Sequence, residues 1–206
     1  MLFLGFSAGL PLLLIFSTLS LWLREAGVER SAVTYFSWAA LGYSFKFVWA
    51  PLVDKLPIPF LHQWLGKRRS WLLVSQGLVI TAMIWMAMND PSTQNGLYYM
   101  AFAAVMLGFS SATQDIVIDA YRREDLADEE LGLGSSMYVY GYRLGMLMAS
   151  GGGLILADHM SFSAVYFLMS LCMLPGILTT LLTPEPKVAA GTPQTMNKSA
   201  KASISG

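Results

Sequence analysis

The stretch Phe109 to Tyr121, FSSATQDIVIDAY, places two carboxylates at the end of an apolar run. The run begins near Leu97 and is long enough to cross a membrane as a helix. A carboxylate in the hydrocarbon costs at least ~2.5 kcal/mol, so acids inside a membrane are rare and usually line a polar path. Asp115 and Asp119 are four residues apart and share one helical face. This stretch predicts a polar site inside a helical membrane protein.

The composition of the whole chain also favours a membrane protein. Apolar residues make up 55% of the 206 residues and charged residues only 13%, whereas a soluble domain carries about 25% charged residues. No segment shows the alternating pattern of a barrel strand. Because ~20 helical residues cover the hydrocarbon core, we expect an all-α membrane protein in the lipid bilayer. Its six transmembrane helices are expected at residues 2–23, 31–53, 71–88, 97–120, 132–156 and 162–183.

The distribution of positive charge predicts the orientation of these helices. Lys and Arg residues follow the second, fourth and sixth expected spans more often than the first, third and fifth. Since Lys and Arg concentrate in cytoplasmic loops, both termini are expected in the cytoplasm. Residues 184–206 are rich in Pro, Ala, Ser, Thr, Gly and Lys and should form a flexible cytoplasmic linker or tail. The chain is thus divided into a transmembrane domain, residues 1–183, and this tail.

A faint internal repeat relates the first three expected spans to the last three. The sequence LGFS at residues 4–7 recurs at residues 107–110, and Gly-Tyr at residues 42–43 recurs at 141–142. A unit of three spans reverses its direction in the membrane when it is repeated. The pattern therefore predicts a 3+3 inverted repeat, as found within each half of a major-facilitator transporter.

Four ionisable side chains lie inside the expected spans, and their charges balance. They are Lys46, Asp115, Asp119 and Arg143. One interpretation is structural, with the basic groups neutralising the acids and holding the bundle together. The other is functional: an aspartate binds and releases a proton, while Lys46 and Arg143 capture an anionic substrate. Asp115 lies deeper than Asp119 and is the preferred proton carrier.

The segment between the second and third expected spans carries a second cluster of charges, namely Asp54, Lys55, Lys67, Arg68 and Arg69. Anchoring on the cytoplasmic side would explain the basic residues. Alternatively, Asp54 pairs with basic side chains or a helix N-terminus in a conformational latch. The acidic residues at 124–130 are interpreted as a solvated loop that caps the fifth span.

Enzymatic function is not favoured by the sequence. Residues 5–9 match the pattern G-x-S-x-G, but a hydrolase needs a strand before that serine, and a membrane helix cannot supply one. His62 and His159 fall in loops on opposite sides of the membrane, and no metal cluster is evident. The same glycines fit close helix packing, as do Gly141 and Gly145. With net charge +0 and no basic stripe, nothing indicates nucleic-acid binding.

Five motifs resemble those of the AmpG-type muropeptide permeases, which are major-facilitator proteins of the bacterial inner membrane. They are LGFSAGLP at 4–11, FKFVWAPLVD at 45–54, GKRRSW at 66–71, SATQDIVIDA at 111–120 and GYRLGM at 141–146. The motifs occur in order across nearly all of residues 1–183. Relatives that import acetyl-coenzyme A share part of this pattern, so the resemblance indicates the family more firmly than the substrate.

The resemblance implies a symporter that uses the proton gradient, without a cofactor, to import anhydromuropeptides for peptidoglycan recycling. Asp115 and Asp119 fall in the motif implied to couple protons. Lys46 and Arg143 would bind substrate carboxylates, and Tyr43, Gln114 and Tyr142 would bind its hydroxyl and amide groups.

Such permeases have twelve or more spans and hold the substrate between two six-span halves. The chain would supply the N-terminal half, with a C-terminal half on the same or a separate polypeptide as its partner. Two alternatives stay open. The chain could be a half-transporter for another anionic solute, such as an acyl-coenzyme A, or a truncated six-span scaffold without transport of its own.

Overall fold

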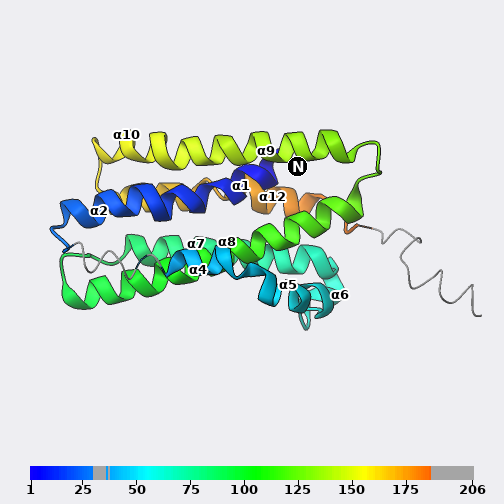
Figure 1. Ribbon diagram of the computed structural model, residues 1–206, viewed down its shortest axis with the longest axis horizontal. Coiled ribbons are helices and arrows are strands. Elements are labelled where there is room, and N and C mark those ends of the chain that lie inside the picture. Colours follow the sequence, from blue (N-terminus) through cyan, green and yellow to red (C-terminus); the bar gives the residue numbers. More distant parts are fainter. Residues whose placement is uncertain (30–35, 37, 187–206) are drawn as a thin grey trace, which may run out of the picture.

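The computed structural model describes residues 1–29, 36 and 38–186, and this part of the chain is helical without any strand (Figure 1). The first and last described helices both reach the same end of the bundle (Figure 1). In chain order the elements are α1 (Leu2–Leu13), the π-helix η1 (Leu14–Thr18), α2 (Leu19–Glu25), α4 (Ala39–Ser44), α5 (Lys46–Lys55), α6 (Leu61–Leu65), α7 (Lys67–Ala87), α8 (Gln94–Asp125), α9 (Leu131–Leu147), the π-helix η2 (Met148–Gly152), α10 (Gly153–Ala157), α11 (Phe162–Leu171) and α12 (Leu174–Leu182).

Four helical segments are long and apolar enough to cross a membrane, and they correspond to the first, third, fourth and sixth expected spans. They are Leu2–Glu25, Lys67–Ala87, Gln94–Asp125 and Phe162–Leu182. The expected second span lies partly outside the described residues, and its described part is divided at Phe45 into α4 and α5. The expected fifth span is helical from Leu131 to Ala157 but is not among these four. The protein is therefore a multi-pass, all-helical membrane protein, whereas six spans remain a prediction.

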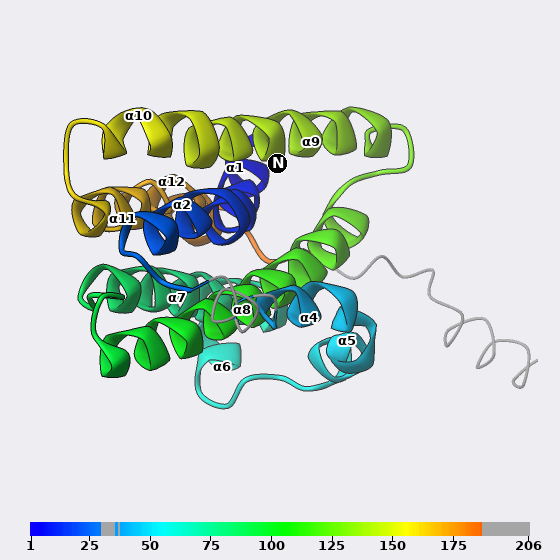
Figure 2. The ribbon, with the colours of Figure 1, turned by 60° about the vertical axis from the view of Figure 1, so that its left-hand side comes forward.

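The helices pack in pairs that run along one another. In the described residues α1 lies along α9, α4 and α5 lie against α8, and α7 lies against α8, α11 and α12. Figure 2 shows α9 and α10 on one side, α1, α2, α11 and α12 in the middle, and α4, α7 and α8 beyond them. This arrangement places α8, which carries the two aspartates, beside several other helices.

Glycines allow α1 and α9 to approach closely, as the sequence predicts. A Cβ atom on Gly5 or Gly9 would collide with the backbone carbonyl of Tyr138 or Tyr142, respectively. From the other side, a Cβ on Gly145 would collide with the carbonyl oxygen of Phe6. The backbones therefore touch directly, which is how small residues drive helix association in a membrane.

Two π-helical turns lie against each other within α1–α2 and α9–α10. Such turns leave backbone carbonyls without their usual helical partner, and hydrocarbon offers no replacement. Here, hydroxyl side chains donate hydrogen bonds to carbonyls of the two turns. Tyr166 donates its hydroxyl to the carbonyl of Leu14 at 2.7 Å, and Thr18 donates to the carbonyl of Ala149 at 2.9 Å. Both hydroxyls are buried, so these hydrogen bonds fix the two turns in place.

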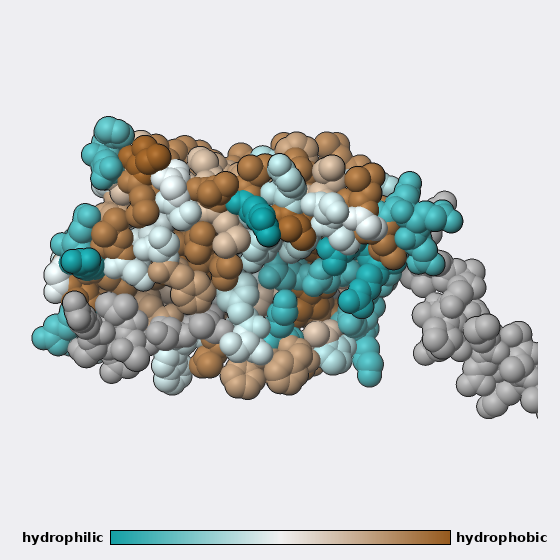
Figure 3. Space-filling model, turned by 45° about the horizontal axis from the view of Figure 1, so that its top comes forward, coloured by the Kyte–Doolittle hydropathy of each residue, from teal (hydrophilic) through white to brown (hydrophobic). Residues whose placement is uncertain are grey.

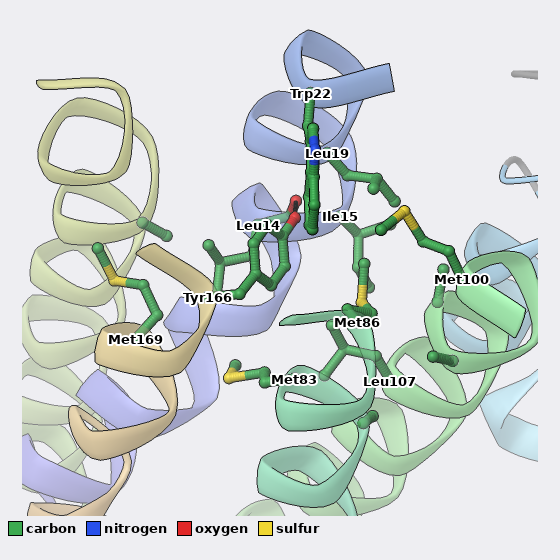
Figure 4. Close-up of a cluster of buried hydrophobic side chains, with 14 of the residues drawn as sticks. Leu14, Ile15, Leu19, Trp22, Met83, Met86, Met100, Leu107, Tyr166 and Met169 are labelled. Carbon is green, nitrogen blue, oxygen red and sulfur yellow. Dashed lines mark hydrogen bonds between the residues drawn. The ribbon is translucent and has the colours of Figure 1, made fainter. Parts of the chain in front are cut away.

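The largest hydrophobic cluster joins α1, η1 and α2 to α7, α8 and α11 (Figure 4). Trp22 stacks on Phe162, with ring centroids 5.6 Å apart. Figure 3 shows apolar side chains over much of one face of the molecule, with hydrophilic side chains at the two ends and a further hydrophilic group near the middle. This distribution is typical of a protein that passes through a bilayer.

Candidate functional site

An open cavity of about 370 Å³ lies between α5, α8 and α9. It is lined by Lys46, Asp115, Asp119, Tyr138, Val139, Tyr142, Arg143 and Met146. Three helices thus bring the four charges expected inside the membrane to a single cavity. A cavity with two carboxylates, two basic groups and two phenols can hold a polar solute.

The two aspartates occupy different environments within this cavity. Asp115 is 7% exposed, and its Oδ1 has no hydrogen-bond partner among the described residues. Lys46 is the opposite charge acting on its carboxylate, and Asp119 is the like charge. Asp119 itself is more exposed and forms an ion pair with Arg122, one helical turn further on, at 3.0 Å. Asp115 is therefore the buried and less compensated acid, although both lie on one face of α8.

Neither basic residue of the cavity is used in an ion pair within the described structure. Arg143 is exposed and Lys46 is half-buried, and both line the cavity. A guanidinium can bind a carboxylate through two parallel hydrogen bonds, while an ammonium acts as a compact point charge. Both groups are therefore free to bind an anion that enters the cavity.

Tyr138 belongs to the cavity but is absent from the residues predicted from the sequence. Its hydroxyl interacts with the Asp115 carboxylate, and the guanidinium carbon of Arg122 lies 5.2 Å from its ring centroid. Its ring is also 6.0 Å from that of Tyr142. The spacing in the sequence could have indicated this residue, because Tyr138 precedes Tyr142 by four residues and so lies on the same face of the helix. Tyr138 connects the environments of the two acids, because Arg122 is itself held by Asp119.

Two of the predicted substrate-binding residues do not line the cavity. Gln114 is completely buried and donates its Nε2 to the hydroxyl of Ser7 at 3.1 Å. Tyr43 donates its hydroxyl to Ser111 at 2.7 Å, across the contact between α4 and α8. The remaining three, Lys46, Tyr142 and Arg143, line the cavity together with the two residues predicted to couple protons, Asp115 and Asp119.

A second charged cluster joins the helices where α5 and α8 end and α7 begins, which we call the charged end. The side chain of Arg68 is 8% exposed and contacts two acids. Its Nη1 lies 2.8 Å from Asp54 Oδ1, and its Nη2 and Nε lie 2.5 and 2.9 Å from the two oxygens of Glu124. Lys67 donates to the backbone carbonyl of Asp54, whereas Lys55 is exposed. The interpretation of Glu124 as part of a solvated loop is wrong, because α8 continues past it and turns its carboxylate towards Arg68.

The charged end also holds the residues that follow α12. Glu185 accepts hydrogen bonds from the backbone N–H groups of Arg68 at 2.7 Å and Arg69 at 3.1 Å, so its carboxylate caps α7. The guanidinium of Arg69 donates to the carbonyls of Thr180 and Leu181 at the end of α12. The sequence assigns Glu185 to the flexible tail, but these contacts hold it against α7. Residues 187–206 of that expected tail lie outside the described part.

No group of three His, Cys, Asp or Glu side chains in residues 1–29, 36 and 38–186 could hold a metal ion.

Comparison with known proteins identifies the family to which the chain belongs. A family model described as the Major Facilitator Superfamily matches residues 1–205. Together with the apolar helices, this match places the chain in a family of multi-pass membrane transporters rather than among enzymes. The chain belongs to the Major Facilitator Superfamily.

Individual relatives give a narrower comparison. The chain is 40% identical to the anhydromuropeptide permease of Escherichia coli K12 over 205 residues, which cover 99% of this chain and 40% of that protein. It is 41% identical to an uncharacterized protein of Haemophilus influenzae, over 90% of this chain and 43% of the relative. It is 42% identical to putative transporter AmpG 4 of Rickettsia conorii, over 75% of this chain and 37% of the relative. The chain thus spans about two fifths of the length of these curated relatives.

Proposed function

We propose that the chain is the N-terminal, six-span half of a proton-coupled importer of anhydromuropeptides in the bacterial inner membrane, working by alternating access with both termini in the cytoplasm. The observation that carries this proposal is the cavity, in which a buried acid meets two basic side chains that form no ion pair among the described residues. Similarity to a permease named for anhydromuropeptides supports the substrate class.

The cavity chemistry suits a substrate that combines carboxylates with sugar hydroxyls. Lys46 and Arg143 bind the carboxylates of the peptide portion, and Tyr142 and Tyr138 offer hydroxyls and ring faces to the sugar. Asp115 takes up the coupled proton, since its carboxylate is buried with one oxygen unpaired. Gln114 and Tyr43, which the resemblance assigns to the substrate, support the cavity through Ser7 and Ser111.

Packing between helices supports the inverted repeat. Gly42 of α4 meets the backbone of Gly108 and Phe109 in α8, and Gly141 of α9 meets the backbone of Leu2 and Phe6 in α1. The repeat seen in the sequence aligns Gly42 with Gly141 and Phe6 with Phe109. One contact of each glycine therefore joins equivalent residues, as two copies of one three-helix unit would.

Complementation tests the proposed function directly. The chain is co-expressed with the C-terminal half of the Escherichia coli permease in cells that lack this permease, and uptake of radiolabelled anhydromuropeptide is measured. We expect uptake only when both halves are present, and strongly reduced uptake for Arg143→Ala. If the inserted halves import acyl-coenzyme A instead, the chain is a half-transporter for another anionic solute. If the halves associate but import nothing, the chain is a scaffold without transport of its own.

A further inference from the structure

Two glutamine side chains are completely buried where α1, α7, α8 and α12 meet, and each has one polar atom without a partner among the described residues. Gln76 of α7 accepts a hydrogen bond from Thr180 of α12 at 3.2 Å through its Oε1, and its Nε2 is unpaired. Gln114 of α8 donates its Nε2 to Ser7 of α1, and its Oε1 is unpaired. The junction therefore contains one unused donor and one unused acceptor.

Both amides lie next to the hydroxyl of Ser7. A Cβ atom placed on Gly176 of α12 would stand 2.5 Å from Ser7 Oγ and 3.4 Å from Gln76 Nε2, so these two atoms flank one point. Gln114 reaches the same hydroxyl directly, at 3.1 Å. Ser7 donates its own proton to the carbonyl of Leu4 at 3.0 Å, which leaves its oxygen with a free lone pair.

These unpaired atoms are unfavourable where they stand. A buried amide group without a hydrogen bond carries a desolvation penalty, and the surrounding hydrocarbon offers no alternative partner. Neither glutamine lines the cavity between α5, α8 and α9. The junction is therefore separate from the candidate substrate site, and its polar atoms require a partner of their own.

We propose that one water molecule is bound at this junction, accepting from Gln76 Nε2 and donating to Gln114 Oε1 and Ser7 Oγ. Three hydrogen bonds are usual for a buried water. A rotation of either amide group by 180° exchanges the positions of its nitrogen and its oxygen. Water can pair with either atom, because it both donates and accepts hydrogen bonds. The water connects α7 and α12 to α1 and α8, and it fixes the residue that precedes Asp115.

A structure of the whole chain in detergent or nanodiscs, at about 2 Å resolution, tests the site directly. We expect density for a water within about 3.2 Å of Gln76 Nε2, Gln114 Oε1 and Ser7 Oγ. A direct hydrogen bond between the two amides, or an unoccupied junction, would overturn the proposal. This readout needs no transport activity, so it is independent of the proposed function.

A double-mutant cycle on the same chain gives a second test. Gln76→Met and Gln114→Met each keep the approximate side-chain volume but leave the opposite amide without its water-mediated partner, so each should lower Tm by roughly 2–10 °C. The double variant removes both unpaired groups and should lose clearly less than the two single losses added together. Gln63→Met, at an exposed position in α6, is the matched control and should leave Tm unchanged. Fully additive losses would contradict a shared water.

Discussion

The guanidinium of Arg68 binds both carboxylate oxygens of Glu124, at 2.5 and 2.9 Å, and thereby joins the start of α7 to the end of α8. A third hydrogen bond of the same guanidinium reaches Asp54 of α5. The planar fork of arginine is suited to this arrangement, whereas the ammonium of lysine cannot form the paired hydrogen bonds. A single side chain of α7 therefore connects three helices, α5, α7 and α8, at the charged end.

Replacing this arginine should loosen the charged end. We expect Arg68→Ala to lower the free energy of unfolding by about 1–3 kcal/mol, because it leaves two partly buried carboxylates unpaired. Arg68→Lys should recover only part of this loss. Thermal unfolding in detergent measures both. Lys55→Ala provides the control, since Lys55 is exposed and outside the ion pairs; an equal loss for this variant would show that general charge, not pairing geometry, matters.

Glu185 should contribute to stability through its position at the start of α7. Its carboxylate accepts two backbone N–H groups and faces the positive end of the helix dipole. We expect Glu185→Gln to reduce stability by about 0.3–1 kcal/mol and Glu185→Ala by about 1 kcal/mol, as for other lost caps. Glu129→Gln, in the exposed turn before α9, should have no effect in the same unfolding assay. Identical behaviour of the two glutamine variants would argue against the cap.

The contact between α1 and α9 should tolerate no side chain at its glycines. Gly145→Ala places a methyl group against the carbonyl of Phe6, so α1 and α9 must separate, at a cost of roughly 1–3 kcal/mol. Gly132→Ala in the same helix meets open space and should be neutral or slightly stabilising. Comparing the two variants by thermal unfolding separates packing from helix propensity. A loss at Gly132 as large as at Gly145 would contradict this account of the contact.

The general fold could be predicted because bilayer thickness imposes long apolar runs that can be read directly from the sequence. The breaks in the helices could not. Phe45, which separates α4 from α5, stands in an apolar run with no Pro or Gly beside it. Likewise, each π-helical turn is held by a hydroxyl from another part of the chain. Tyr166 of α11 donates to Leu14 of η1, and Thr18 of η1 donates to Ala149 of η2. Tertiary contacts determine these features, and periodicity does not report them.

The site was predictable to the extent that charge inside the membrane is unusual. Lys46 and Arg143 stand out in apolar runs, and the cavity includes both. Tyr138 was missed and Glu124 was assigned to a loop, because a tyrosine in an expected span and an acid just after one both have common explanations. The resemblance assigned Gln114 to the substrate, but adjacent residues on a helix face different directions, and Gln114 turns to Ser7 and does not line the cavity.

Neutralising the two aspartates separately should distinguish their roles in the complete two-half transporter. We expect Asp115→Asn to abolish proton-driven accumulation of labelled anhydromuropeptide but to preserve exchange of labelled for unlabelled substrate, which requires no net proton movement. Asp119→Asn should have a smaller effect on accumulation, because Asp119 is paired with Arg122 and is more exposed than Asp115.

Both rates are measured in membrane vesicles with an imposed pH gradient, after protein levels are matched. Asp90→Asn serves as the control, since this aspartate lies in the exposed turn before α8 and should leave both rates unchanged. Normal accumulation by Asp115→Asn would remove this residue as the proton carrier. Loss of exchange together with accumulation would instead assign Asp115 to substrate binding or to the integrity of the cavity, because a pure coupling residue is needed only when the proton gradient drives uptake.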